Sequence, residues 1–376
     1  MKQEDKPAAF PVRVLVADDS AFMRTALRRM LESDPNIVVV AMAQDGQKAV
    51  ELCAEHDPDV VTLDLEMPRL NGLQALQKIM QTRPRPVIMV SSLTTAGAEA
   101  TLEAFSLGAF ECIPKPMSHA SLDIIRVRQD LIDKVKAAFA SRERYHHLLK
   151  VPAIKTPASS ANIAASLRRN ATRTQIVCIG CSTGGPAALQ RILPVLPGDL
   201  PAAIVVVQHM PVGFTGPFAK RLNTLCQLEV EEARADQVLE RGRVLIAPAG
   251  FHTTFSKRTP AGYSISLSND RKGFLHMPSV DVMMKSAAEV FDEPAIGVIL
   301  TGMGADGAQG IKALHGRGSI TIGQDEGSCV VYGMPKACAE MGTLDKQLAL
   351  DEIPAEIVKT LSRESHPVPA AMRTHS

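Results

Sequence analysis

The sequence of 376 residues has few aromatic side chains: they make up 4% of positions, with no tryptophan and three tyrosines. It also has almost no net charge, because 41 Lys and Arg face 40 Asp and Glu. A near-neutral chain argues against a nucleic-acid binder that works by bulk electrostatics, since such domains are usually clearly basic. The low aromatic content predicts cores of Val, Ile, Leu, Met and Ala, which suits buried parallel strands covered by helices.

The chain lacks long apolar runs, and its one Cys-x-x-Cys spacing, Cys178 and Cys181, has no second pair to complete a four-cysteine zinc site. Its seven cysteines are scattered and odd in number, which predicts free thiols in a reducing compartment and not a disulfide framework or a zinc site. The apolar run 202–207 is far shorter than a membrane span, and the charged start, 1–7, has no signal-peptide pattern. We therefore expect a cytoplasmic protein that is not inserted directly into a membrane.

Strand-like and helix-like patterns alternate along the chain and divide it into two α/β domains. Five short apolar runs separated by amphipathic segments span 11–135 and predict a doubly wound parallel sheet. The alternation restarts at 174 and continues to 362, where the stretch 263–268 predicts an antiparallel hairpin strand. Between the domains, 136–173 is expected to form a helical extension and a linker, and 363–376 a flexible tail.

Polar side chains follow four predicted strands of the first domain: Asp18 and Asp19, Asp64, Ser91 and Lys115. Because functional residues of open α/β sheets lie just past the carboxyl ends of the strands, we expect these groups to gather on one edge. Clustered carboxylates need a cation, and hard oxygen ligands suit Mg²⁺. Asp64 could then accept a phosphoryl group, with Lys115 and Ser91 neutralising its charge. Any one such aspartate, taken alone, is more often a turn or a helix cap.

The segments 14–20, 63–68, 71–72 and 114–116 together resemble response-regulator receiver domains. The resemblance implies a flavodoxin-like fold and phosphorylation of Asp64 by a histidine kinase. It also implies a Mg²⁺ pocket formed by Asp18, Asp19 and Asp64 with the backbone carbonyl of Glu66, and a switch in which the Ser91 hydroxyl moves toward the phosphate beside Lys115. One residue departs from the pattern, since Cys112 stands where receivers usually carry a switch Tyr or Phe.

The second domain contains a possible nucleophile in Gly-Cys-Ser-Thr-Gly, residues 180–184. The segment follows a predicted strand, opens a helical pattern, and fits the G-x-S-x-G turn that exposes a serine at a helix N-terminus. The pattern alone leaves a dinucleotide or phosphate loop open. The G-x-G-x-x-G fingerprint of such loops is absent, however, because Ser182 occupies the place of its second glycine.

A nucleophilic Ser182 needs a base, and the domain offers four histidines. His209 ends its strongest predicted strand and should reach the same edge as Ser182. His252 is expected in a loop five residues beyond a strand, where it fits substrate contacts. His276 is expected in a loop and His315 in a helix.

Asp306 is the one carboxylate in a glycine-rich loop, 302–307, that follows a predicted buried strand. The glycines would let it fold under a histidine. The roles are then nucleophile for Ser182, general base for His209 and orienting acid for Asp306. The order Ser, His, Asp along the chain differs from that of α/β-hydrolases.

Four segments of this domain, 179–186, 208–211, 278–283 and 300–307, resemble the chemotaxis protein-glutamate methylesterase (CheB) family. The resemblance implies a Rossmann-like α/β domain and the same triad, with an oxyanion-hole donor at the Met303 N–H and Thr183 bordering the site. It implies hydrolysis of glutamyl methyl esters, and often deamidation of glutamines, on methyl-accepting chemotaxis receptors. The phosphodonor would be the histidine kinase CheA, and the hydrolase step would need no cofactor.

Two other classes of protein stay open. A DNA-binding response regulator would need a compact helix-turn-helix and a basic face, whereas 175–360 shows strand alternation and glycine-rich turns. A catalytically idle adaptor would bind receptors without hydrolysis, and an active-site serine probe would distinguish it. The same chemistry on a different methylated protein also stays open, as does the occurrence of deamidation.

Overall fold

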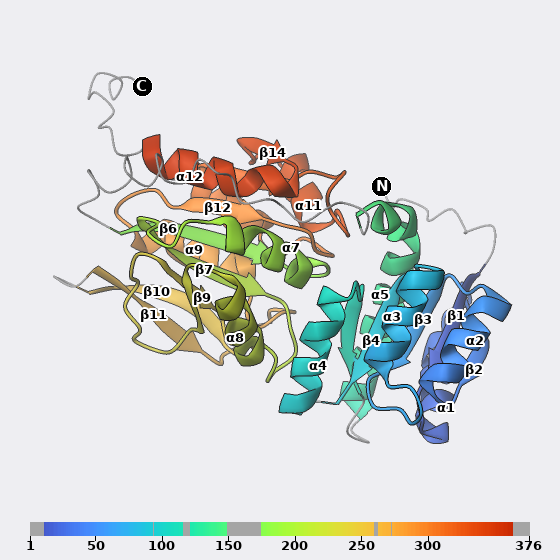
Figure 1. Ribbon diagram of the computed structural model, residues 1–376. Helices are drawn as coiled ribbons and strands as arrows, with labels where there is room; N and C mark the ends of the chain where they lie inside the picture. The colour runs from blue at the N-terminus through green and yellow to red at the C-terminus, as the bar shows by residue number, and fades with distance from the viewer. Residues whose placement is uncertain are drawn as a thin grey trace. The chain divides into compact units, whose positions relative to one another are not determined.

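The computed structural model describes residues 11–92, 94–115, 121–148, 174–258, 262–271 and 273–363. The chain separates into two compact units, the first built on β1 to α5 and the second on β6 to α12 (Figure 1). Residues 149–173 of the predicted linker and 364–376 of the predicted tail lie outside the described residues. None of the described helices is long and apolar enough to cross a membrane.

The first unit is a five-stranded parallel sheet in the order β2-β1-β3-β4-β5. Its strands are β1 Val12–Ala17, β2 Ile37–Ala43, β3 Val60–Asp64, β4 Val87–Ser91 and β5 Glu111–Pro114. Its helices are α1 Ala21–Leu31, α2 Gly46–His56, α3 Gly72–Thr82, α4 Thr95–Ser106 and α5 Ser121–Leu148. Helix α1 packs against α5, and α3 packs against both α2 and α4, so helices cover both faces. This confirms the predicted flavodoxin-like fold.

The second unit is a seven-stranded parallel sheet in the order β14-β13-β12-β6-β7-β9-β8. Its strands are β6 Gln175–Cys181, β7 Ala202–Gln208, β8 Glu229–Glu232, β9 Arg243–Ile246, β12 Ile296–Ile299, β13 Thr321–Gln324 and β14 Lys346–Leu348. A separate antiparallel pair, β10 His252–Arg258 and β11 Gly262–Ser268, confirms the predicted hairpin.

Helices flank this sheet on both sides (Figure 1). They are α7 Gly185–Ile192, α8 Thr215–Leu225, α9 Val280–Val290, α10 Ala308–Gly316, α11 Met334–Glu340 and α12 Ile353–Arg363. The parallel strands with helical crossovers confirm the predicted α/β class for this unit as well. Because all the strands of the main sheet run the same way, the residues that follow β6, β7 and β12 lie at one edge.

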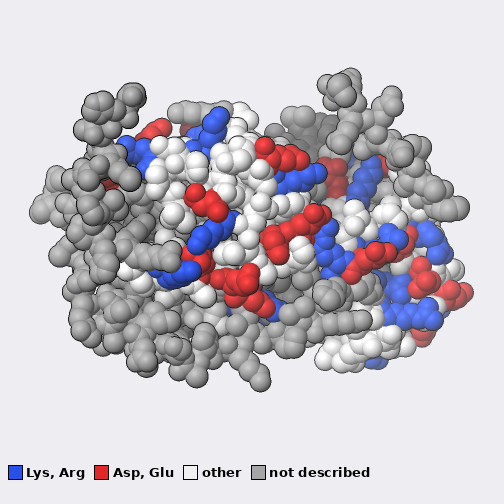
Figure 2. Space-filling view, turned by 90° about the horizontal axis from the view of Figure 1, so that it is seen from above, with Lys and Arg blue, Asp and Glu red and all other residues white. Residues whose placement is uncertain are grey.

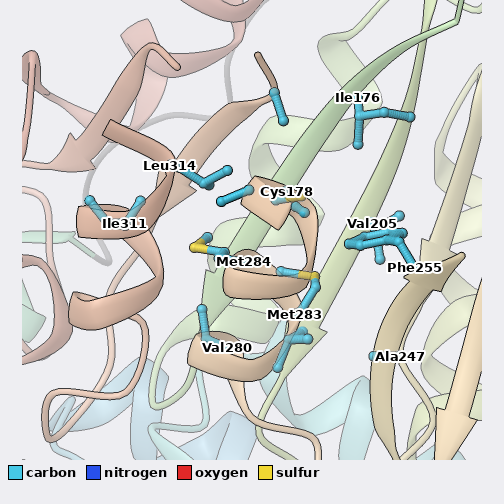
Figure 3. Close-up of a cluster of buried hydrophobic side chains, with 14 of the residues drawn as sticks. Ile176, Cys178, Val205, Ala247, Phe255, Val280, Met283, Met284, Ile311 and Leu314 are labelled. Carbon is cyan, nitrogen blue, oxygen red and sulfur yellow. The ribbon is translucent and has the colours of Figure 1, made fainter. Parts of the chain in front are cut away.

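The core beneath that edge is aliphatic and sulfur-rich, as the scarcity of aromatic residues predicts. Helix α9 packs on β6, and α10 packs on α9 and β12, through one continuous buried cluster (Figure 3). Its labelled members are Ile176, Cys178, Val205, Ala247, Phe255, Val280, Met283, Met284, Ile311 and Leu314. All seven cysteines lie within the described residues and are free thiols.

Two strands of the main sheet lack the apolar pattern on which the sequence analysis depends. Strand β8, Glu229–Glu232, contains three glutamates, and β14, Lys346–Leu348, has only three residues. Both lie at the edges of the sheet. Edge strands are half solvated and are often short and charged, which limits pairing with other chains. Their sequences therefore carry little strand signal.

Charges of opposite sign are mixed on the surface. Figure 2 shows acidic and basic side chains interspersed among the described residues of the face in view. In the second unit Arg243 contacts three carboxylates, those of Glu229, Glu231 and Glu240, at 2.9 to 3.2 Å. Such mixing differs from the basic face that a DNA-binding output domain needs.

Shortening Ile311 tests the core beneath the sheet edge. Ile311 on α10 is fully buried, so Ile311→Ala should lower the free energy of unfolding by about 2–5 kcal/mol through lost burial and a cavity. Urea unfolding followed by circular dichroism measures this, because the chain has no tryptophan. The neighbouring exposed Lys312→Ala is the matched control. Equal stability of the two variants would contradict the burial of Ile311 in this core.

Candidate active site

Ser182 lies on a sharp turn between β6 and α7. Its N–H donates to the Thr301 carbonyl at 3.0 Å, and its own carbonyl accepts the Gly185 N–H at 2.8 Å. Gly184 adopts a φ of +79°, and a Cβ there would come within 2.6 Å of Val330. The turn therefore needs glycine for both conformation and space. Ser182 itself is half-buried at the carboxyl edge of the sheet.

His209 comes directly after β7 and is tied to the same turn. Its N–H donates to the carbonyl of Cys181, the residue before Ser182, at 3.1 Å. The Gln208 side-chain amide donates to the carbonyls of both Ser182 and His209, at 3.0 and 2.9 Å. Gln208 is buried. It joins the serine turn to the histidine, a function that the sequence analysis did not anticipate.

The His209 ring contacts Asp306, as the sequence predicts. His209 Nε2 lies 2.8 Å from Asp306 Oδ2, and the two side chains are 9% and 13% exposed. His209 Nδ1 is buried and hydrogen-bonds to no described residue. Nδ1 is thus the nitrogen left to accept a proton, and the Ser182 Oγ bond to it is not formed in this structure. Catalytic hydrogen bonds of unliganded enzymes often tighten only when substrate binds.

Asp306 is held by the start of α9. Its Oδ1 accepts the Ser279 hydroxyl at 2.8 Å and the Asp281 N–H at 3.0 Å, and its Oδ2 accepts the Val280 N–H at 2.8 Å. Burial raises the pKa of this carboxyl, but the hydrogen bond and charge of His209, together with the two N–H groups, outweigh burial and bring the pKa well below its usual range. Asp306 is therefore ionised at neutral pH and can stabilise an imidazolium.

Asp281 performs the reciprocal task for α10. Its Oδ1 accepts the N–H groups of Gly307 and Gly310 at 3.0 and 2.7 Å. Asp306 thus binds the N-terminus of α9, which contains Asp281, and Asp281 binds the N-terminus of α10, which follows Asp306. The helix dipole favours negative charge at both places. The segment 278–283 carried the family resemblance without an assigned role. An N-capping Ser279 followed closely by Asp281 was the signal that could have indicated one.

The predicted oxyanion donor lies in the loop that packs against Ser182. A Cβ on Gly302 would come within 2.9 Å of the Ser182 Cβ, so this loop passes directly beside Ser182. No described residue accepts a hydrogen bond from the next N–H, that of Met303. Thr183 is buried, and its carbonyl accepts the Thr301 hydroxyl at 2.9 Å.

The other three histidines lie in different environments. The sequence predicts a loop at His252, and this prediction is wrong. His252 is the first residue of β10, where it pairs with Ser268 and is 3% exposed. The strand starts there because the hairpin pairing extends to that residue. Burial lowers the pKa of His252. His276 stacks on His209, with ring centroids 4.0 Å apart and planes 14° apart. His315 lies in α10 near Asp345.

A second polar cluster lies at the carboxyl edge of the first unit. Carboxylate oxygens of Asp18, Asp19 and Asp64 all lie within 4.8 Å of one another. Lys115 Nζ is 2.7 Å from Asp64 Oδ2 and 3.3 Å from Asp18 Oδ2. Burial, with the nearby Asp18 charge, raises the pKa of Asp64 to about 6 against the effect of Lys115. Apart from the Lys115 ammonium, no described group binds the buried Asp18 Oδ2, and the three clustered carboxylates fit a cation bound by oxygen.

The remaining receiver residues lie around this cluster. The Glu66 N–H donates to Asp64 Oδ1 at 3.3 Å. Ser91 is buried, and its hydroxyl donates to the carbonyls of Ser92 and Gly97, both at 3.2 Å. Ser91 therefore points to the start of α4 and would have to leave these partners to reach Asp64.

The position of the usual switch aromatic is filled by a small buried side chain. Cys112 Sγ lies 3.6 Å from the Thr101 hydroxyl, and burial raises the pKa of the thiol to about 12. The nearby Phe110 packs edge-on against Tyr145 of α5, with centroids 5.5 Å apart. Phe110 immediately precedes β5 and is 1% exposed, so residues 110–115 carry no exposed aromatic ring.

Two family models match the chain, one for each unit. The model described as CheB methylesterase matches residues 177–357, and the model described as response regulator receiver domain matches residues 14–125.

Relatives match over nearly the whole chain. It is 45% identical over 368 residues to protein-glutamate methylesterase/protein-glutamine glutaminase 1 of Oleidesulfovibrio alaskensis, covering 93% of this chain and 99% of that protein. It is 46% identical to the protein-glutamate methylesterase/protein-glutamine glutaminase of Symbiobacterium thermophilum, covering 93% of this chain and 97% of that one. The chain belongs to the CheB methylesterase family. The crystal structure of the Thermotoga maritima CheB methylesterase catalytic domain is 40% identical, with a TM-score of 0.49, and covers 50% of this chain and all of that one.

In this CheB-family chain, Asp306→Asn tests the acid that holds His209. The amide keeps the shape but cannot stabilise the imidazolium or fix its tautomer. The rate at which a fluorophosphonate labels Ser182 should fall by as much as about 10⁴. Asp351→Asn, which removes a carboxylate from the surface pair with Arg191, is the control. Labelling of the Asp306 variant at the wild-type rate would contradict the assignment.

Proposed function

We propose that the chain is a phosphorylation-activated serine hydrolase that demethylates glutamyl methyl esters, and deamidates glutamines, on methyl-accepting chemotaxis receptors in the cytoplasm. The hydrolase comprises 174–362 and the receiver 11–135, joined by the extension and linker 136–173. The names of the relatives support the activity. The observation that carries the proposal is the ionised Asp306 in contact with His209, directly beside the serine turn.

The reaction proceeds by acyl transfer to Ser182. As Ser182 Oγ attacks the ester carbonyl, its proton passes to His209 Nδ1, the nitrogen that Asp306 leaves free. The carbonyl oxygen becomes an oxyanion, which the Met303 N–H stabilises from the adjacent loop. The C–O bond then breaks, and methanol leaves with the proton from His209.

Water completes the cycle by the same route. His209 takes a proton from water as the water attacks the acyl-enzyme, and it returns this proton to Ser182 Oγ as the bond to that oxygen breaks. The product is a glutamic acid side chain, which ionises to the carboxylate. A glutamine substrate differs in its leaving group, which is ammonia. One triad therefore serves both reactions, and no cofactor takes part in the hydrolase step.

Phosphorylation of Asp64 is the proposed input signal. Asp18, Asp19 and Asp64, with the Glu66 carbonyl, would hold Mg²⁺, which supplies positive charge against the carboxylates and phosphoryl oxygens. The phosphodonor is the histidine kinase CheA. Lys115 stabilises the product, and Ser91 leaves its backbone partners to reach it. The acyl phosphate carries roughly −1.5 to −2 charges in place of the single charge of the carboxylate, and this change activates the hydrolase.

Substitution of Ser182 separates ester hydrolysis from phosphorylation of Asp64. Ser182→Ala should abolish methanol release from methylated receptors, because it removes the hydroxyl that forms the acyl-enzyme. Phosphorylation of Asp64 by a small phosphodonor should continue. Asp64→Asn is the complementary variant, with basal methanol release retained and stimulation by the phosphodonor lost. Turnover retained by Ser182→Ala would refute the assignment of the nucleophile.

A metal-binding test addresses the receiver pocket. Without metal, three clustered carboxylates repel one another, so Asp64→Asn should raise the melting temperature in EDTA by roughly 3–8 °C. Adding MgCl₂ should stabilise the wild-type protein and have little effect on this variant. The exposed Glu103→Gln on α4 is the control and should respond to MgCl₂ as the wild type does. An equal response of all three proteins would rule out Mg²⁺ binding at Asp64.

A further inference from the structure

We propose that His276 is a positioning residue for the hydrolase: its ring covers one face of the His209 imidazole and keeps that imidazole in line with Asp306. The inference deepens the proposed function, because it rests on His209 acting as the base. No role follows for His276 from the sequence pattern, which places it only in a loop before Pro278.

The geometry of the two rings is a close parallel stack. Their centroids are 4.0 Å apart and their planes differ by 14°. In a parallel stack the nitrogen lone pairs and N–H groups lie within each ring's own plane, so the rings exchange no proton or hydrogen bond across the stack. His276 therefore acts on His209 through its ring face, by contact and exclusion of water, and not as a second base.

His209 needs such support because only one of its ring atoms is held by a hydrogen bond. Nε2 contacts Asp306, whereas Nδ1 has no partner among the described residues. A ring held at one atom can tilt about that contact, and a tilt moves Nδ1 away from the nucleophile. The flat surface of His276 removes this freedom on one side.

The segment that carries His276 also positions the acid. His276 covers the His209 ring, while Ser279, Val280 and Asp281 donate the hydrogen bonds that hold Asp306. The segment is itself anchored by the Gly250 N–H, which donates to the Met277 carbonyl at 3.0 Å. One short stretch of chain thus sets the base and the acid relative to each other.

The residues just before His276 show that apolar burial does not determine its orientation. Phe274 is 39% exposed and Leu275 is 85% exposed. The Phe274 ring packs edge-on against His252, with centroids 5.1 Å apart, whereas Leu275 extends into solvent and the more polar imidazole of His276 lies against His209. This arrangement favours a functional reason for the inward position.

Three substitutions in the full chain test the proposal. His276→Ala removes the ring, His276→Gln keeps polarity without a ring, and His276→Phe keeps a flat ring without nitrogens. Alanine and glutamine should lower kcat for methanol release by roughly 10- to 100-fold, the effect of a misplaced catalytic group, with KM nearly unchanged. Phenylalanine should recover most of kcat. Fluorophosphonate labelling of Ser182 should follow the same order, since it needs the base but no receptor.

Controls separate this inference from the proposed function and from loss of folding. His315→Ala removes an imidazole that is 44% exposed on α10 and should leave kcat unchanged. Thermal melting by circular dichroism identifies variants that fold, and the phenylalanine and glutamine variants keep the comparison valid if alanine does not.

Three results would overturn the proposal: wild-type kcat and labelling in the alanine and glutamine variants, a phenylalanine variant as slow as glutamine, or a change in KM alone. Turnover by Ser182→Ala would instead refute the proposed triad, independently of His276.

Discussion

The arrangement of the hydrolase depends on one buried carboxylate, that of Asp306. A buried charge is costly unless it is paired and hydrogen-bonded, and Asp306 meets this requirement with one hydroxyl, two helix N–H groups and the His209 ring. Satisfying the charge brings the loop after β12, the start of α9 and the residue after β7 to one place. The His209 ring is therefore oriented as a consequence of stabilising the Asp306 carboxylate.

Close packing holds the start of α9, which binds Asp306, against the end of β6, which leads into Ser182. Gly180 belongs to the serine motif, and a Cβ there would lie 2.3 Å from a methyl group of Val280, whose N–H binds Asp306. The first turn of α9 thus rests directly on the end of β6. Asp281, in that turn, binds the start of α10 in return. Close packing at Gly180 and the exchanged carboxylates make the serine turn and the acid parts of one rigid arrangement.

Each unit carries a buried aspartate at the carboxyl edge of its own sheet, but the pKa values of the two aspartates shift in opposite directions. In the receiver, burial and a neighbouring carboxylate raise the pKa of Asp64 to about 6, which suits a site that needs a cation. In the hydrolase, hydrogen bonds and His209 lower the pKa of Asp306, which suits an acid that must stay ionised without a metal. The difference lies in the number of N–H and hydroxyl donors around each carboxylate.

The sequence by itself determined the two α/β domains and which residues end which strands, because parallel strands bring their carboxyl ends to one edge. Ser182, His209, Asp306 and Asp64 follow from that rule. Local patterns could not indicate the charged edge strand β8, or that β10 starts at His252, because pairing partners decide these. Only the tertiary structure placed Ser279 and Asp281 on their partners and His276 on His209, since these contacts join segments that are distant in the chain and carry no periodic signal.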